Sequence, residues 1–191
     1  VTAWQNLFFV SMTQYDPTFK NPVAFQEEEI TQPLGWAVAE AGLQQLRVAE
    51  SEKFAHVTSF LNGGRDEPFP GELRVAIPSV NVEDYSTRPE MSAKEISEQT
   101  IKAIGSGRYD MIVMNYANPD MVAHTGKFEA TVKALELLDE QIGRVVDTTL
   151  AAGGAVLLTG DHGHAEAMRN LLTHQASTDH TTSPVPLVYI T

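Results

Sequence analysis

The chain has 191 residues, enough for one sizeable α/β domain with its own hydrophobic core. Its net charge of −12 argues against a nucleic-acid partner, and its lack of cysteine excludes disulfides, thiolate catalysis and zinc–sulfur sites. We expect a cytoplasmic protein without a membrane partner, because no apolar stretch reaches membrane-spanning length and the N-terminus does not resemble a signal peptide.

Short apolar runs alternate along the chain with amphipathic segments. We predict strands over 7–12, 45–50, 73–78, 109–117, 155–159 and 185–190, with a loop over 13–33. We predict helices over 34–43, 51–64, 91–107 and 128–154. Ser51 is the expected cap of the second helix, and Ser92 with Glu95 is the expected capping box of the third. Because the strands are apolar throughout, we predict an α/β fold with a mainly parallel sheet and helices on both faces, in three layers.

Polar clusters follow two of the predicted strands directly. Asp120 and His124 lie in NPDMVAH (118–124), after strand 109–117, and Asp161 and His162 lie in DHGH (161–164), after strand 155–159. Ligands of such sheets bind at the carboxyl ends of the strands, where these side chains would meet. Carboxylates and neutral imidazoles suit Mn²⁺ or Zn²⁺, so the two clusters together predict a metal site.

Further polar residues stand near the same predicted strand ends. His174 and His180 lie in HQASTDHTTSPVP (174–186), and spacing alone does not choose between them. Lys53 stands in the first turn of a predicted helix, where the helix dipole disfavours a cation, which suggests a phosphate-binding role or else a solvated side chain. We assign His56, three residues later, to the helix surface or the edge of the core.

Four stretches, in order along the chain, resemble the cofactor-independent (2,3-bisphosphoglycerate-independent) phosphoglycerate mutase family. They are AESEKFAHVTSFLNGG, NYANPDMVAHTG, TGDHGHAE and HTTSPVPL, and EPFPGE and RPEMSA between them fit as well. The resemblance covers the chain from LFFVSMT to PVPLVYI. It implies an alkaline-phosphatase-like α/β fold and an enzyme of glycolysis and gluconeogenesis that interconverts 2- and 3-phosphoglycerate through a phosphoserine intermediate.

The resemblance also implies a centre of two divalent ions, with Mn²⁺ expected and no need for 2,3-bisphosphoglycerate. Carried over by motif, the ligands of one ion are Asp120, His124 and His180, and those of the other are Asp161 and His162. Lys53 should contact the transferring phosphoryl group, whose negative charge two cations and a lysine can stabilise together. The implied partner is a small phosphorylated carboxylate, and the complete protein is expected to be a monomer.

The sequence departs from the family pattern in three ways. In the family, the nucleophilic serine lies in a motif further upstream. None of Ser11, Ser51, Ser59 and Ser92 of this chain stands in such a motif. The family's closing segment is also missing, so we expect residues 1–191 to be the C-terminal portion of the metal-binding phosphatase domain, incomplete at both ends. Without the N-terminal portion and the inserted transferase domain, this piece should have no mutase activity alone. Finally, His164 replaces the asparagine that usually follows DHG; of two roles, orienting a metal ligand or serving as an extra ligand, we favour the first.

Two alternatives stay open from the sequence. The ligand pattern is shared with other phosphomutases and phosphatases of the alkaline phosphatase superfamily, such as phosphopentomutase, although AESEKFAHVTSFLNGG and EPFPGE favour the glycolytic mutase. The other alternative is a non-catalytic metal-binding fragment. The number of ions bound would separate a complete centre from a partial one.

Overall fold

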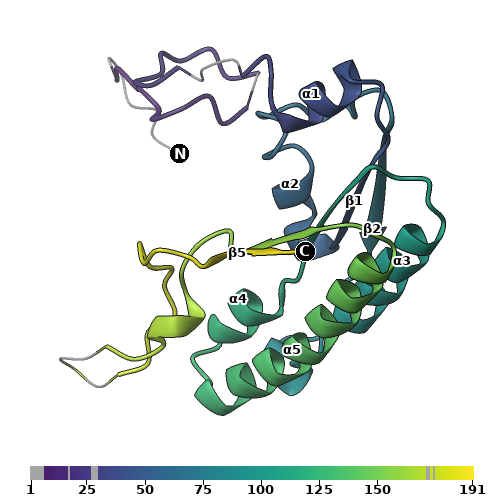
Figure 1. Cartoon of the computed structure of the whole chain (residues 1–191). Helices are drawn as coiled ribbons and strands as arrows, with labels where there is room; N and C mark the ends of the chain where they lie inside the picture. The colour runs from purple at the N-terminus through teal and green to yellow at the C-terminus, as the bar shows by residue number, and fades with distance from the viewer. Residues whose placement is uncertain (1–6, 17, 27–29, 171–172, 174) are drawn as a thin grey trace. The chain divides into compact units, whose positions relative to one another are not determined.

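The computed structural model describes residues 7–191 apart from 17, 27–29, 171–172 and 174 (Figure 1). His174 therefore lies outside the described residues. The chain divides into two compact units, residues 1–31 and 32–191. In the first unit, the described residues form one isolated parallel bridge, between Ser11 and Val23. The strand predicted over 7–12 is wrong, because a strand needs a hydrogen-bonded neighbour along its length and residues 7–10 have none there.

The second unit is built on a sheet of three parallel strands in the order β2 (Glu72–Ile77), β1 (Gln45–Glu50) and β3 (Met111–Asn115). Val48 of the central strand pairs with Val75 on one side and Met114 on the other. Every residue of β1 is buried, including Glu50, whose two carboxylate oxygens have no hydrogen-bond partner among the described residues. The predicted parallel sheet is confirmed for these three strands.

Helices flank this sheet. They are α1 (Leu34–Glu40), α2 (Phe54–Val57), α3 (Ala93–Gly105), α4 (Asn118–Ala123) and α5 (Phe128–Ala151). Figure 1 shows α1 and α2 on one side of the sheet and α3 with α5 on the other. Alternate residues of β1 accordingly have different partners: Leu46 and Val48 pack against Ile96 of α3, while the Gln45 side chain donates a 2.9 Å hydrogen bond to the Gly35 carbonyl of α1. The predicted α/β fold with flanking helices is confirmed.

The helix that we predicted over 51–64 is shorter than expected. A 3₁₀ turn, η1 (Ser51–Lys53), precedes α2, and the Thr58 hydroxyl bonds back to the Phe54 carbonyl where α2 ends. The two predicted caps are also wrong. Ser51 and Ser92 use their hydroxyls on carbonyls at the end of β2, those of Ile77 at 3.4 Å and Pro78 at 2.9 Å, so neither is free to cap a helix.

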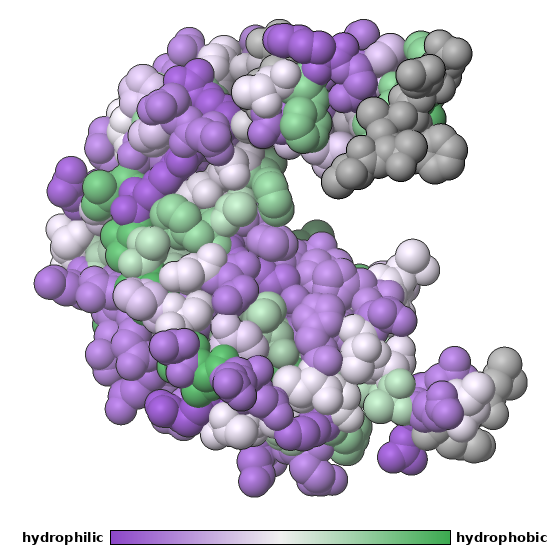
Figure 2. Space-filling view, turned by 180° about the vertical axis from the view of Figure 1, so that it is seen from behind, coloured by the Kyte–Doolittle hydropathy of each residue, from purple (hydrophilic) through white to green (hydrophobic). Residues whose placement is uncertain are grey.

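Strands β4 (Val156–Thr159) and β5 (Leu187–Ile190) pair with each other and not with the parallel sheet. The pair is antiparallel, with Leu157 opposite Tyr189. Both of these side chains are exposed, so β4 and β5 are not part of the helix-covered parallel sheet that we predicted. Hydrophilic residues dominate the face seen in Figure 2, in keeping with the net charge of −12. In the part of the chain that the structure describes, no helix is long and apolar enough to cross a membrane.

Candidate metal centre

The ends of β1 and β3 supply the first residues of the site. Lys53 follows β1 through the single turn η1, and Asp120 lies in α4, which begins three residues after β3. Pro119 occupies the first turn of α4, where its fixed φ angle favours a helix, and His124 is the residue that follows the last turn of α4. Residues four apart share one helix face, and His124 Nε2 accordingly lies 3.3 Å from Asp120 Oδ1.

The loop after β4 meets the segment before β5 at a backbone bridge between Gly163 and Thr181. The Thr181 amide donates a 2.8 Å hydrogen bond to the Gly163 carbonyl, and a Cβ at Gly163 would collide with the Thr181 hydroxyl. Glu166 ties the bridge together, because its carboxylate accepts from the Thr181 hydroxyl and from the backbone amide of His164. These hydrogen bonds lower the pKa of Glu166 to about 2. The bridge places His164 and His180 on the same site.

Four side chains converge here, and we call Asp120, His124, His164 and His180 the first cluster. Asp120 Oδ1 lies 3.1 Å from His180 Nε2 and 2.5 Å from His164 Nδ1, and the Nε2 atoms of His124 and His180 are 3.1 Å apart. A divalent ion with bonds of about 2.0–2.2 Å holds neighbouring ligand atoms roughly 3 Å apart. The 3.1 Å spacings therefore fit a metal ion, whereas the 2.5 Å between His164 and Asp120 is that of a short hydrogen bond.

The proton positions of the cluster point the same way. His124 Nδ1 lies 2.8 Å from the Thr178 carbonyl, which can only accept, so Nδ1 carries a proton and the neutral ring leaves a lone pair on Nε2. That lone pair faces the Asp120 carboxylate. Burial alone would raise the pKa of Asp120, but hydrogen bonds from Lys53 and His164 hold it well below its ordinary value. A cation between the ionised Asp120 oxygen and the His124 lone pair would offset their mutual repulsion.

A second cluster consists of His56, Asp161 and His162. Asp161 accepts a 3.3 Å hydrogen bond from the Asn115 amide at the end of β3. The His162 ring stacks on that of His180 with 4.0 Å between their centroids, so the two clusters adjoin. One carboxylate and two imidazoles offer three ligand atoms for a second ion.

Lys53 joins the two clusters. Its Nζ lies 2.6 Å from Asp120 Oδ2 in the first cluster and 3.3 Å from His162 Nε2 in the second. The side chain is only 6% exposed, whereas lysine is normally solvated. The solvated lysine that the sequence left open is therefore wrong: Lys53 is buried among the polar groups of the site.

The structure brings every residue that we predicted as a site residue to this one location. Asp120, His124 and His180 meet in one group and Asp161 with His162 in another, as the motif comparison grouped them. Two members of the clusters were given other roles in the prediction. We assigned His56 to the helix surface or the edge of the core, and we expected His164 to orient a metal ligand. The spacing of DHGH was the only sequence signal for His164, and His56 had none.

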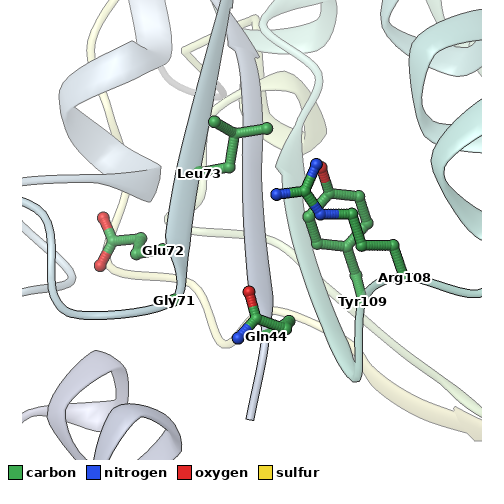
Figure 3. Close-up of a pocket in the computed structure, with 6 residues that line it drawn as sticks. All are labelled: Gln44, Gly71, Glu72, Leu73, Arg108 and Tyr109. Atoms are coloured by element: carbon green, nitrogen blue, oxygen red, sulfur yellow. The ribbon is translucent and has the colours of Figure 1, made fainter. Parts of the chain in front are cut away.

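A pocket lies at the opposite end of the sheet. Figure 3 shows it near the beginnings of β1, β2 and β3, lined by Gln44, Gly71, Glu72, Leu73, Arg108 and Tyr109. It offers no imidazole and lies at the amino ends of the strands. We therefore assign no metal-dependent role to it.

Known proteins resemble this chain in sequence and in fold. The profile of the Metalloenzyme superfamily matches residues 23–191. The chain belongs to this family. The 2,3-bisphosphoglycerate-independent phosphoglycerate mutases of Nitrosococcus oceani and Pseudomonas aeruginosa PAO1 are 51% and 52% identical to it over 182 residues. The match covers 95% of this metalloenzyme chain and 35% of each relative, so the chain spans about a third of their length.

A structure of Leishmania mexicana phosphoglycerate mutase at low cobalt concentration has the same fold. It superposes with a TM-score of 0.85 at 30% identity, over 94% of this chain and 35% of that one. The resemblance to phosphoglycerate mutases that the motifs indicated is thereby confirmed.

Proposed function

We propose that this chain is the metal-binding part of a 2,3-bisphosphoglycerate-independent phosphoglycerate mutase. In the proposal, Asp120, His124 and His180 hold one divalent ion and Asp161 with His162 holds a second, with Mn²⁺ as the working metal. The observation that carries it is the position of Lys53, whose ammonium group lies between two clusters of metal-binding side chains. A phosphoryl group bound there would face three cations, the ammonium group and the two ions.

The chain's own residues have distinct roles in this proposal. Held by Asp120, His124, His180, Asp161 and His162, the ions would supply positive charge that stabilises the oxygens of a transferring phosphoryl group. Lys53 donates hydrogen bonds to the same oxygens. The low pKa of Asp120 keeps it ionised and ready to bind at neutral pH, and the Thr178 carbonyl orients the His124 ring. We further propose that the complete protein is a cytoplasmic monomer that acts on 2- and 3-phosphoglycerate.

Titration calorimetry with Mn²⁺ tests the metal sites. We expect two ions per chain, and one fewer tightly bound ion in Asp120→Asn, which keeps the shape of the side chain but loses its charge. Asp179→Asn is the matched control, because Asp179 is an exposed aspartate one residue from His180 and outside both clusters. Equal binding by both variants and the wild type would contradict the proposed first site.

The substrate is tested by ³¹P NMR of 3-phosphoglycerate in the presence of the Mn²⁺-loaded chain. Paramagnetic Mn²⁺ broadens the phosphorus signal only when the phosphate lies close to the ion. We expect stronger broadening with the wild type than with Lys53→Met at equal metal occupancy, because the lysine holds the phosphate. Identical broadening would remove Lys53 from the proposed site.

The reaction itself is tested in a chimera in which this chain replaces its 51% identical counterpart in the Nitrosococcus oceani mutase. We expect interconversion of 2- and 3-phosphoglycerate that Asp120→Asn abolishes and Asp179→Asn does not. A folded, metal-loaded chimera without activity would favour a non-catalytic metal-binding role for these residues.

A further inference from the structure

His164 occupies the interior of the first cluster and has the least exposed imidazole there. Its side chain is 3% exposed, against 39% for His124 and 48% for His180. Its ring centroid lies 4.3 Å from that of His124 and 5.1 Å from that of His180. Its Nδ1 lies 2.5 Å from Asp120 Oδ1, the oxygen that the other two imidazoles also face. Three rings thus present a nitrogen to one carboxylate oxygen.

Burial removes the polar atoms of the His164 ring from water, and only Nδ1 has a partner among the described residues that can offset this cost. The other nitrogen, Nε2, is buried and has no hydrogen-bond partner among the residues that the structure describes. An unpartnered buried polar atom costs free energy, and the polar interaction of this ring is therefore made at Nδ1. A hydrogen bond to Asp120 is one possibility, and an ion shared with the rest of the first cluster is the other.

The surrounding atoms favour the ion. The His124 lone pair, the His180 nitrogen and the ionised Asp120 oxygen already converge, with 3.1–3.3 Å between them. The Nδ1 atom of His164 belongs to the same group, in which all four ligand atoms lie within 4.8 Å of one another. A cation that neutralises the first three atoms therefore lies within reach of the fourth.

We propose that His164 binds the first ion through Nδ1, which gives a site of one carboxylate and three imidazoles. This inference rests on the proposed function, since it needs an ion at the first cluster, and it replaces the orienting role that we expected for His164 from the sequence. It also predicts metal preference. Imidazole nitrogen suits Zn²⁺ better than Mn²⁺, so the third imidazole should make this site more selective for Zn²⁺.

Two variants separate a ligand from a hydrogen-bond donor. His164→Asn places an amide N–H at about the position of the ring Nδ1, so it can still donate to Asp120, but it lacks the nitrogen lone pair that binds a metal. His164→Ala removes both functions. If His164 is a metal ligand, both variants lose that ligand. If His164 only donates a hydrogen bond to Asp120, the interaction is lost in His164→Ala alone.

The experiment is X-ray absorption spectroscopy on the Zn²⁺-loaded chain, combined with Zn²⁺ and Mn²⁺ titrations. All samples carry His162→Asn, so that the second cluster contributes fewer imidazoles. We expect three coordinated imidazoles, and two in both His164→Asn and His164→Ala. Removing an outer partner of a ligand already weakens metal binding about 10–100-fold, so Zn²⁺ affinity should fall at least about tenfold in both variants, and Mn²⁺ affinity less. His56→Asn, outside the first cluster, is the control and should keep the count at three.

Other outcomes overturn the proposal in distinguishable ways. Full Zn²⁺ affinity and an unchanged imidazole count in His164→Asn would show that His164 only donates a hydrogen bond to Asp120. Two imidazoles in every sample, with Zn²⁺ bound, would also overturn the inference but leave the proposed metal site standing. Failure of the chain to bind any ion at the first cluster would overturn both.

Discussion

The buried contact between Lys53 and Asp120 gives a prediction whose size follows from the structure. The two side chains are 6% and 11% exposed and lie 2.6 Å apart. Removing one partner of a buried ion pair costs about 3–5 kcal/mol, because the other charge is left uncompensated. The imidazoles around Asp120 compensate part of that charge, so we expect Lys53→Met to lose about 3 kcal/mol, near the lower end of that range.

The assay is urea unfolding followed by circular dichroism, with a chelator present so that bound metal does not contribute. At a slope of about 2 kcal/mol per molar urea, the midpoint should fall by about 1.5 M. Lys127→Met is the matched control: Lys127 also lies 2.6 Å from an aspartate, Asp84, but these side chains are 57% and 37% exposed. Because solvent screens exposed pairs, the control should move the midpoint little.

Equal midpoint shifts in the two lysine variants would refute the reasoning, because burial is the main difference between the pairs. A double-mutant cycle adds a second check. If Lys53 and Asp120 interact directly, Lys53→Met combined with Asp120→Asn should cost less than the sum of the single changes. Strictly additive costs would mean that the contact does not contribute to stability.

Three further predictions concern burial, the loop bridge and the ions. Burial raises the pKa of Glu50, so the unfolded chain releases this proton at lower pH than the folded chain, and stability should fall as pH rises above about 4.5. Glu50→Gln cannot ionise, so its melting temperature should exceed that of the wild type at pH 8 but not at pH 4; equal pH profiles would count against this. Gly163→Ala should displace Thr181 and lower Zn²⁺ affinity at least about tenfold in a calorimetric titration, as loss of a ligand's support does, because its Cβ meets the Thr181 hydroxyl; unchanged affinity would contradict it. Zn²⁺ at 100 times its dissociation constant should stabilise the wild type by about 2.7 kcal/mol in a urea titration, and His180→Ala by less; equal stabilisation would argue against His180 as a ligand.

The sequence predicted best what depends on local pattern. The apolar runs located β1, β2 and β3, and the amphipathic segments located α3 and α5 to within a few residues. Prediction from the sequence failed where the role of a side chain or the pairing of a strand depends on a partner that is distant along the chain. Ser92 looked like a helix cap because the preference is local, but its hydroxyl donates to the carbonyl of Pro78, just after β2 and fourteen residues earlier. The pairing of β4 with β5 was missed for the same reason, because the sequence of a strand does not show whether its partner runs parallel or antiparallel to it.

The candidate site shows the same division. Motif spacing identified Asp120 with His124 and Asp161 with His162, because each pair is close in sequence. No spacing rule could place His164 Nδ1 beside Asp120, since 44 residues separate them and the contact depends on the bridge at Gly163. The burial of Lys53 was likewise invisible, because a lysine after a strand is solvated in most proteins.

The site joins two parts of the domain that should differ in how often they open. Lys53 follows β1, whose six residues are all buried, so the amide protons of that strand should exchange with solvent only when the whole domain unfolds. His180 instead stands on an exposed segment before β5, where the amides should exchange through local opening. An ion held by His180 together with Asp120, whose carboxylate pairs with Lys53, would prevent that local opening. Metal binding should therefore slow hydrogen exchange mainly around His180 and leave β1 almost unchanged.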